Sequence, residues 1–155
     1  MAQRQLQDQL ERWYCQWTRT ERLYEAFAQR NGLTMTALSV MRYLLKQGPC
    51  TQRVLCQGIG CPKQTISSLV KTLEAMGFVR RTACQEDRRS VLVALTEAGC
   101  DRAEHVLKRL RQAEEAALTA MGAEARAAFL EHNEALTRAL ERAMQHGEGE
   151  DERTD

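Results

Sequence analysis

The sequence predicts a mainly α protein of the α+β class, and three observations point to it. Apolar residues recur at helical spacing through most of the 155 residues, and only two prolines interrupt them. Between residues 78 and 95 the apolar period changes from 3.6 to 2, which is the pattern of two strands joined by a polar loop. Directly before this hairpin, two short helical patterns flank a turn that contains glycine. Helix, turn, helix and hairpin in this order are the parts of a winged helix-turn-helix with a two-stranded wing.

The first two predicted helices are separated by a glycine turn. A long amphipathic pattern predicts a helix over about residues 3–29. Asn31-Gly32 ends it, because glycine readily adopts the left-handed conformation that follows a helix. Thr34 or Thr36 then caps a second helix, which stops at Gly48-Pro49.

The helix-turn-helix follows between residues 51 and 77. Thr51 is suited to cap its first helix. Pro62 is expected at the first position of its second helix, where a missing N–H costs nothing. That helix is expected to end at Met76, before Gly77. Its apolar residues, expected to pack inward, are Ile66, Leu69, Val70 and Leu73.

The two helices of this motif must approach each other closely. They are joined by a turn over residues 58–61, which holds two glycines. Small side chains are needed where two backbones come close, and we assign Cys56 and Gly60 to those positions.

The wing is predicted from residues 78–82 and 90–95 as strands, with the polar residues 85–89 between them. A two-stranded hairpin is not stable alone, so we expect it to lean on the helices. Thr96 is then suited to cap a fifth helix that ends at Met121-Gly122.

A sixth helix is expected from about residue 123. The first, fifth and sixth helices are amphipathic and have no other core to join, so we expect them to pack with their counterparts from a second chain. The predicted organisation is therefore a helical dimerisation region over residues 1–34 and 97–146, and a winged helix-turn-helix DNA-binding lobe over residues 35–96. Residues 147–155 contain no apolar residue and are expected to be a disordered acidic tail.

The net charge of +1 hides an asymmetry along the chain. Residues 51–95 carry seven Lys and Arg against three acids, whereas residues 141–155 carry two against six. Phosphate neutralisation and counterion release drive nucleic-acid binding. The sequence therefore predicts that double-stranded DNA meets the basic segment.

The fourth predicted helix carries short polar side chains that its packing does not use, as contact with a major groove requires. These are Lys63, Gln64, Thr65, Ser67, Ser68 and Lys71. We assign Gln64, Thr65 and Ser68 to base edges, since the amino-terminal half of such a helix points into the groove. Lys63 and Lys71 are assigned to phosphates. The alternative is that these residues form an ordinary solvated helix face.

The tip of the predicted hairpin holds Asp87, Arg88 and Arg89. A guanidinium is suited to the narrow minor groove, where the negative potential is enhanced, and Asp87 can hold one of the arginines through a bidentate pair. Considered alone, this tripeptide is more typical of a solvated turn than of a DNA contact. Its position after the helix-turn-helix favours a DNA-binding wing.

The chain resembles the MarR family of bacterial transcriptional regulators over about residues 5–145. The matching residues are Lys63-Gln64-Thr65-Ile66-Ser67, Leu73-Glu74-x-x-Gly77-Phe78-Val79-x-Arg81, and Asp87-Arg88-Arg89 followed by Leu95-Thr96-x-x-Gly99. The resemblance implies a winged-helix homodimer, held together by its amino- and carboxy-terminal helices, that usually represses by binding a palindromic operator. It also implies that Asp87 and Arg89 act as a pair. Pro62 departs from the pattern, because many members have a Ser or another capping residue there.

The resemblance further implies release of DNA by a small anionic or phenolic molecule, or by oxidation of a thiol. The first predicted helix is rich in aromatic residues, which suit a pocket for a phenolic or aromatic ligand but are more typical of a dimer core. The candidate pocket residues are Trp13, Tyr14, Trp17, Tyr24 and Arg42. Cys15 is the candidate redox residue, with Arg12 and Arg19 placed to stabilise a thiolate. A buried and inert Cys15 is the alternative.

Other classes of function find little support in the sequence. The chain has no glycine-rich phosphate loop and no nucleophile motif, so we expect no enzyme and no cofactor. None of the six cysteines forms a Cys-x-x-Cys pair, and the three histidines are widely separated, so no metal site is expected. No apolar run is long enough to span a bilayer, and the amino terminus lacks a signal-peptide core. We therefore expect a cytoplasmic protein without a membrane partner. A non-specific architectural DNA-binding protein is the alternative to a sequence-specific regulator.

Overall fold

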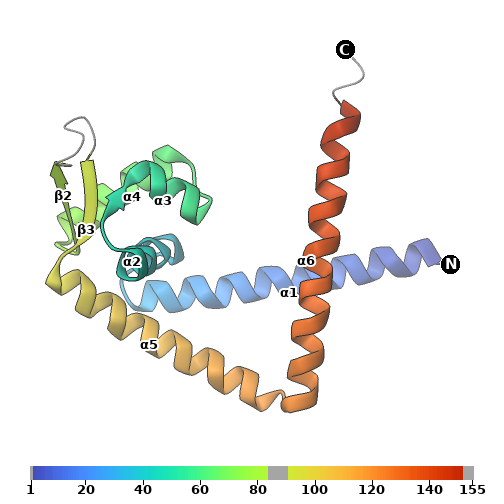
Figure 1. The fold of residues 1–155 in the computed structure, drawn as a ribbon. Helices are drawn as coiled ribbons and strands as arrows, with labels where there is room; N and C mark the ends of the chain where they lie inside the picture. Colours follow the sequence, from blue (N-terminus) through green and yellow to red (C-terminus); the bar gives the residue numbers. More distant parts are fainter. Residues whose placement is uncertain (1, 84–90, 152–155) are drawn as a thin grey trace. The chain divides into compact units, whose positions relative to one another are not determined.

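The computed structural model describes residues 2–83 and 91–151. Its elements in chain order are α1 (Ala2–Arg30), α2 (Met35–Gln47), β1 (Cys50–Thr51), α3 (Gln52–Ile59), α4 (Lys63–Ala75), β2 (Val79–Ala83), β3 (Val91–Leu95), α5 (Glu97–Ala120) and α6 (Ala123–Asp151) (Figure 1). The chain divides into two compact units, residues 1–110 and residues 111–155. The predicted fold class is confirmed, since α3, α4 and the β2–β3 hairpin form a winged helix-turn-helix.

The helices of the first unit end where the sequence places glycine. After α1, the N–H of Gly32 donates to the Gln29 carbonyl and the N–H of Leu33 donates to the Ala28 carbonyl, at 2.9 and 3.0 Å. The same pair of bonds follows α4, where Gly77 and Phe78 take the two donor positions. Gly32 and Gly77 have φ values of +66° and +76°, which favour glycine. These caps turn the chain sharply between α1 and the lobe and between α4 and the wing.

Threonine side chains begin three of the helices. Of the two candidates before α2 it is Thr34 that caps it, accepting a hydrogen bond from the Ala37 N–H at 3.1 Å. Thr51 caps α3 through the Val54 N–H in the same way, as predicted. Thr96 accepts from the Gly99 N–H at 3.0 Å and so begins α5, also as predicted.

The placement of Pro62 at the first helical position is wrong by one residue. Its ψ of 146° is extended, so Pro62 is the N-cap of α4 and the helix begins at Lys63. The Pro62 carbonyl accepts the first helical bond, from the Ile66 N–H at 3.1 Å. Because proline sets only φ, its sequence preference does not decide between these two neighbouring positions.

The sheet contains one strand more than the predicted hairpin. Its order is β1-β3-β2 and both pairings are antiparallel. In the wing, Val79 pairs with Leu95 and Ala83 pairs with Val91. On the other edge of β3, Cys50 pairs with Val93. Two residues are too few to display an alternating pattern, so the sequence analysis missed β1.

The hydrophobic core lies in the lobe and against the first half of α5, and it draws on nearly every element of the first unit. Its largest fully buried side chains are Leu38, Val40, Met41, Leu55, Ile66, Val70, Leu73, Val93 and Val106. Burying one such side chain stabilises the fold by about 1.5–3 kcal/mol. Because the inner face of α4 is buried in this core, the core fixes the orientation of the helix.

The role predicted for Gly60 is wrong. An added Cβ at Gly60 meets nothing within 4 Å, and Gly60 instead supplies the left-handed φ of +72° that ends α3. The close approaches occur at Gly58, where a Cβ would overlap the Tyr43 ring, and at Gly99, where it would overlap the Phe78 carbonyl. Which backbones approach depends on the packing of α2 and α5, and helical periodicity does not reveal it.

The start of α5 is fastened to the end of α4. The Thr96 hydroxyl donates to the Gly77 carbonyl at 2.7 Å, and the Thr96 N–H donates to the Phe78 carbonyl at 3.1 Å. The missing side chain at Gly99 leaves room for this contact. Thr96 and Gly99, noted in the sequence as parts of one motif, therefore join the wing to α5.

Asn31 joins the end of α1 to α5. It is a buried polar residue, 5% exposed, and its side-chain amide donates to the Phe27 carbonyl at 2.8 Å. Its side-chain oxygen accepts from Arg109 at 3.0 Å, and its main-chain carbonyl accepts from Arg102. Two cations at the carboxyl end of α1 also suit the negative end of the helix dipole.

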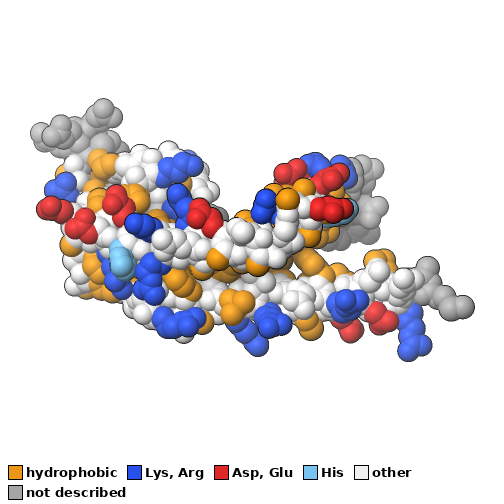
Figure 2. All heavy atoms as spheres, turned by 90° about the horizontal axis from the view of Figure 1, so that it is seen from below, with side chains coloured by type: hydrophobic (Ala, Val, Ile, Leu, Met, Phe, Trp, Pro, Cys, Tyr) orange, Lys and Arg blue, Asp and Glu red, His pale blue; other side chains and the backbone are white. Residues whose placement is uncertain are grey.

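The long helices α1 and α6 carry large apolar side chains that the chain does not cover. On α1, Leu6, Tyr14 and Trp17 are 65, 56 and 54% exposed. On α6, Phe129 and Met144 are 48 and 66% exposed. Figure 2 shows hydrophobic side chains reaching the surface between charged ones on the face that it draws. Within the described residues, no helix is long and apolar enough to cross a membrane.

The carboxyl end of α6 differs from the prediction. The helix continues to Asp151, through residues 147–151 that we expected to belong to the tail. Extending an existing helix adds one hydrogen bond for each residue fixed, so polar residues can continue it without a core contact. The other four tail residues lie outside the described part of the chain.

Candidate nucleic-acid interface

Helix α4 has two different faces. Ile66, Val70 and Leu73 are at most 1% exposed and anchor its inner face in the core. Gln64, Ser68 and Lys71 are exposed and follow one another at intervals of four and three residues, so they form one outward stripe. A rigid helix thus presents hydrogen-bonding groups away from the protein.

The remaining residues assigned to DNA on α4 lie beside this stripe. Lys63 and Thr65 are exposed in the first turn, whereas Ser67 is half-buried. Thr72, which the sequence analysis did not select, is also exposed and donates its hydroxyl hydrogen to the Ser68 carbonyl at 3.2 Å. Ser67 is therefore less available to an outside partner than the other five residues of the prediction.

An ion pair between α4 and β2 was not predicted as a functional feature. Glu74 accepts a hydrogen bond from Arg81, and the side chains are 33 and 39% exposed. This hydrogen bond lowers the pKa of Glu74 below its ordinary value and raises that of Arg81. The pair connects the last turn of α4 to the first wing strand. Both residues belong to one motif of the sequence, but only the turn at Gly77 brings their side chains together.

The tip of the wing lies outside the described residues, and with it Asp87, Arg88 and Arg89. The strands that lead to it are described. Val79 at the base of β2 is buried, and the four residues after it, Arg80 to Ala83, are exposed. The hairpin is thus anchored at its base beside α4.

Comparison with known proteins agrees with this architecture. Residues 31–90 match the model of the MarR family. The solved structure of NMB1585, a MarR family regulator from Neisseria meningitidis, superposes with a TM-score of 0.69 and 22% identity, covering 90% of this chain and 98% of that one. Over residues 31–90 the chain therefore resembles the MarR family. The match to NMB1585 extends the MarR fold beyond the lobe to nearly the whole chain.

Two further comparisons concern a curated relative and a DNA complex. An uncharacterised HTH-type transcriptional regulator of Bacillus subtilis, YwhA, is 25% identical over 59% of this chain. That match covers 66% of YwhA, slightly less than two thirds of its length. Overoxidised AbfR, solved bound to DNA, superposes with a TM-score of 0.63 and 22% identity over 90% of this chain and 99% of AbfR.

The candidate ligand residues lie in different surroundings. The Trp13 ring lies 5.0 Å from the Tyr14 ring and 5.7 Å from the Trp17 ring, measured between centroids. Tyr24 is half-buried and packs against the core. Arg42 lines a separate hollow between α2 and α3, and none of the four aromatic candidates lines it.

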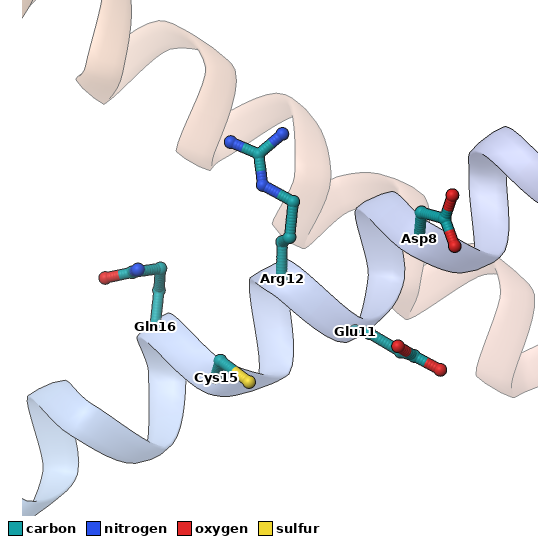
Figure 3. A pocket seen from close by; sticks show the side chains of 5 residues that line it. All are labelled: Asp8, Glu11, Arg12, Cys15 and Gln16. Carbon is teal, nitrogen blue, oxygen red and sulfur yellow. The ribbon is translucent and has the colours of Figure 1, made fainter.

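The surroundings of the candidate thiol Cys15 are polar. Cys15 is exposed on α1, in a shallow hollow that is also lined by Asp8, Glu11, Arg12 and Gln16. Figure 3 shows the Arg12 guanidinium extending away from the Cys15 sulfur, with the Glu11 carboxylate on the side of the sulfur. The expected pairing of Arg12 with a Cys15 thiolate is absent from this arrangement.

The other thiols and the acidic side chains offer no additional centre in the part of the chain that is described. Cys50, Cys56, Cys61 and Cys100 are half-buried. Burial raises the pKa of the Cys50 thiol, which lowers its thiolate fraction. No three His, Cys, Asp or Glu side chains come together there as metal ligands would.

Proposed function

We propose that this chain is a sequence-specific, DNA-binding transcriptional repressor of the MarR type that acts as a homodimer on a palindromic operator. The observation that carries the proposal is the division of α4 into a buried apolar face and an exposed polar stripe of Gln64, Ser68 and Lys71. In a helix-turn-helix the second helix occupies the major groove, where amide and hydroxyl groups read base edges. A related fold, that of AbfR, has been solved bound to DNA.

The wing supplies the second contact of the proposal. Arg88 and Arg89 would enter the minor groove beside the operator half-site, with Asp87 holding one guanidinium. The Glu74–Arg81 ion pair joins the wing strand to α4, so the two DNA contacts would move as one body. Replacing Arg89 with Ala is expected to weaken operator binding without changing dimerisation.

The homodimer is supported by the exposed apolar side chains of the long helices. Leu6, Leu10, Tyr14 and Trp17 follow one face of α1 and are each at least 46% exposed. Phe129, Leu136 and Met144 follow one face of α6 and are at least 40% exposed. Exposed apolar stripes of this length are typical of subunit interfaces, and a second copy would present the same two stripes.

The direct test is a gel shift at fixed salt with the DNA upstream of the protein's own gene. Binding to that DNA should exceed binding to unrelated DNA by a factor on the order of 10³ or more. Equal binding to both, with a steep salt dependence, would instead favour a non-specific architectural protein.

Base readout by α4 has its own test. Ser68→Ala should change the relative preference among half-site variants more than it changes affinity for unrelated DNA. Thr119→Ala, at an exposed hydroxyl on α5, is the matched control and should change neither. Equal losses on every DNA sequence would contradict base readout by Ser68.

The release signal is proposed to be a small aromatic ligand or oxidation of a thiol, and one experiment separates the two. The neighbouring rings of Trp13, Tyr14 and Trp17 support release by an aromatic ligand. The exposure of Cys15 supports release by oxidation of its thiol. The gel shift is repeated with phenolic acids, and with peroxide followed by reductant. Release by peroxide that Cys15→Ser abolishes would assign the signal to the thiol. Release by a phenolic acid together with a change in tryptophan fluorescence would assign it to the ligand.

A further inference from the structure

The hollow between α2 and α3 combines positive charge with hydrogen-bond donors. It encloses about 440 Å³, more than ten times the share of one water molecule in the liquid. Its lining residues are Ser39, Arg42, Tyr43, Lys46, Gln47, Gly58 and Ile59. Two of these side chains are cationic, three others carry a hydroxyl or an amide, and none is acidic.

The two cations stand close together without a counter-charge. Arg42 and Lys46 are four residues apart on α2, so they are neighbours on one helix face and repel each other. Among the described residues, neither has a carboxylate within ion-pair distance. The carboxyl end of α2 accounts for Lys46, since a cation there suits the helix dipole. Arg42 lies one turn earlier, where the helix dipole stabilises a cation only weakly.

The shape of the hollow depends on a close contact between the two helices. Tyr43 lies against Gly58, and a Cβ at that position would be 2.9 Å from the Tyr43 hydroxyl oxygen. Glycine therefore lets the phenol form a wall between α2 and α3. Ser39 and Tyr43 are half-buried residues of the lining, and the exposed Arg42 and Lys46 also line the hollow.

We propose that this hollow is a phosphate-binding site in which Arg42 and Lys46 neutralise the anion and the hydroxyl groups of Ser39 and Tyr43 donate hydrogen bonds to its oxygens. Paired cations with neutral donors match the charge and the several acceptor oxygens of a phosphate. The phosphate belongs either to a phosphodiester of bound DNA or to a free phosphorylated molecule. In its DNA form the inference rests on the proposed function, because the hollow adjoins the turn of the helix-turn-helix at Ile59.

The test compares a double variant with a control of equal charge. Arg42→Gln with Lys46→Gln removes both cations of the hollow, and Arg22→Gln with Lys108→Gln removes two exposed cations elsewhere, on α1 and α5. Inorganic phosphate is added to each protein and to the wild type, against potassium chloride at equal ionic strength, and thermal unfolding is recorded. At ten times its dissociation constant, a bound phosphate should raise the midpoint of the wild type and of the control by about 4 °C. The double variant should not respond to it.

The second arm uses operator DNA. A phosphodiester in the hollow predicts that the double variant binds DNA about tenfold more weakly, with the slope of log affinity against log salt reduced by about 1. The control should keep the slope of the wild type. A response to free phosphate without any change in DNA binding assigns the site to a free molecule.

Failure of the phosphate site and failure of the proposed function give different results. A double variant that matches the control in both arms overturns the phosphate site. If no protein binds DNA, the proposed function fails, and the unfolding experiment with inorganic phosphate still decides the site.

Discussion

Apolar residues are buried in the winged helix-turn-helix lobe but exposed on the long helices. In the lobe, Ile66, Val70 and Val93 are completely buried by elements of the same chain. On α1 and α6, residues such as Leu6 and Met144 are about two thirds exposed. Apolar surface removed from water stabilises a fold, so the lobe has its partners within the chain while the long helices lack theirs. The contrast predicts that stability of the lobe is independent of protein concentration, whereas order in the long helices depends on it.

Truncation in the lobe core should have the largest effect. Ile66→Ala leaves a cavity beneath α4 and is expected to lower the free energy of unfolding by about 2–5 kcal/mol. Chemical denaturation at two protein concentrations measures it, and the loss should be the same at both. Leu130→Ala, at a residue on α6 that is 48% exposed, is the comparison. An equally large loss for Leu130→Ala at low concentration would break the contrast between the regions.

The contact between α4 and α5 gives the next effect. Gly99→Ala forces a Cβ into the Phe78 carbonyl and is expected to cost about 1–3 kcal/mol by displacing the start of α5. Gly122→Ala is the contrasting variant, because nothing lies within 4 Å of a Cβ there and only the φ of +77° opposes it. If thermal unfolding shows the smaller loss for Gly99→Ala, the close approach is not a constraint.

A polar substitution on the exposed stripe of α1 should act on association. Leu10→Gln removes an apolar side chain that is 46% exposed and is expected to raise the dimer dissociation constant about tenfold, which corresponds to about 1.4 kcal/mol. Glu11→Gln, one residue later and outside that stripe, should leave it unchanged. Sedimentation over a concentration series measures both. Unchanged association for Leu10→Gln would remove this stripe from the interface.

The smallest effect is expected at the ion pair between α4 and the wing. The pKa of Glu74 is lowered from 4.5, so its carboxylate stabilises the folded state above that pH, and the stabilisation disappears as the pH falls through the lowered value. Glu74→Gln should therefore be slightly less stable than the wild type at neutral pH, and the difference should vanish in acid. Unfolding midpoints between pH 3 and 7 test this, since a constant difference would contradict the ion pair. The pair is exposed, so screening by salt keeps the effect small.

Local residue chemistry predicted most of the fold. Thr34, Thr51 and Thr96 cap helices and Gly77 ends α4, because each of these features involves residues within a few positions of one another. The inner face of α4 followed from its periodicity for the same reason. Strand β1 was not predictable from periodicity, because its two residues are defined only by their pairing with β3.

The candidate site was likewise predictable where it depends on a single helix and unpredictable where it depends on contacts between elements. Exposure of Gln64, Ser68 and Lys71 was predictable, because the opposite face of the helix had to be apolar. The sequence analysis grouped Arg42 with the aromatic residues of α1, and the structure places it beside α3 instead. The Glu74–Arg81 pair likewise needed the turn at Gly77 to bring two elements together. Contacts between elements depend on how the helices cross, and no single periodicity contains that information.

The sequence by itself determined the class of this protein. The order of caps, glycines and apolar periods specified a winged helix-turn-helix, because each signal acts over a few residues and does not need the rest of the chain. The tertiary structure decided which distant residues come together: Asn31 bonds to Arg102 and Arg109, Thr96 bonds to Gly77, and Arg42 and Lys46 line one hollow with the end of α3. These contacts lie between residues 12 to 78 positions apart, where packing of the whole core rather than local propensity fixes the geometry.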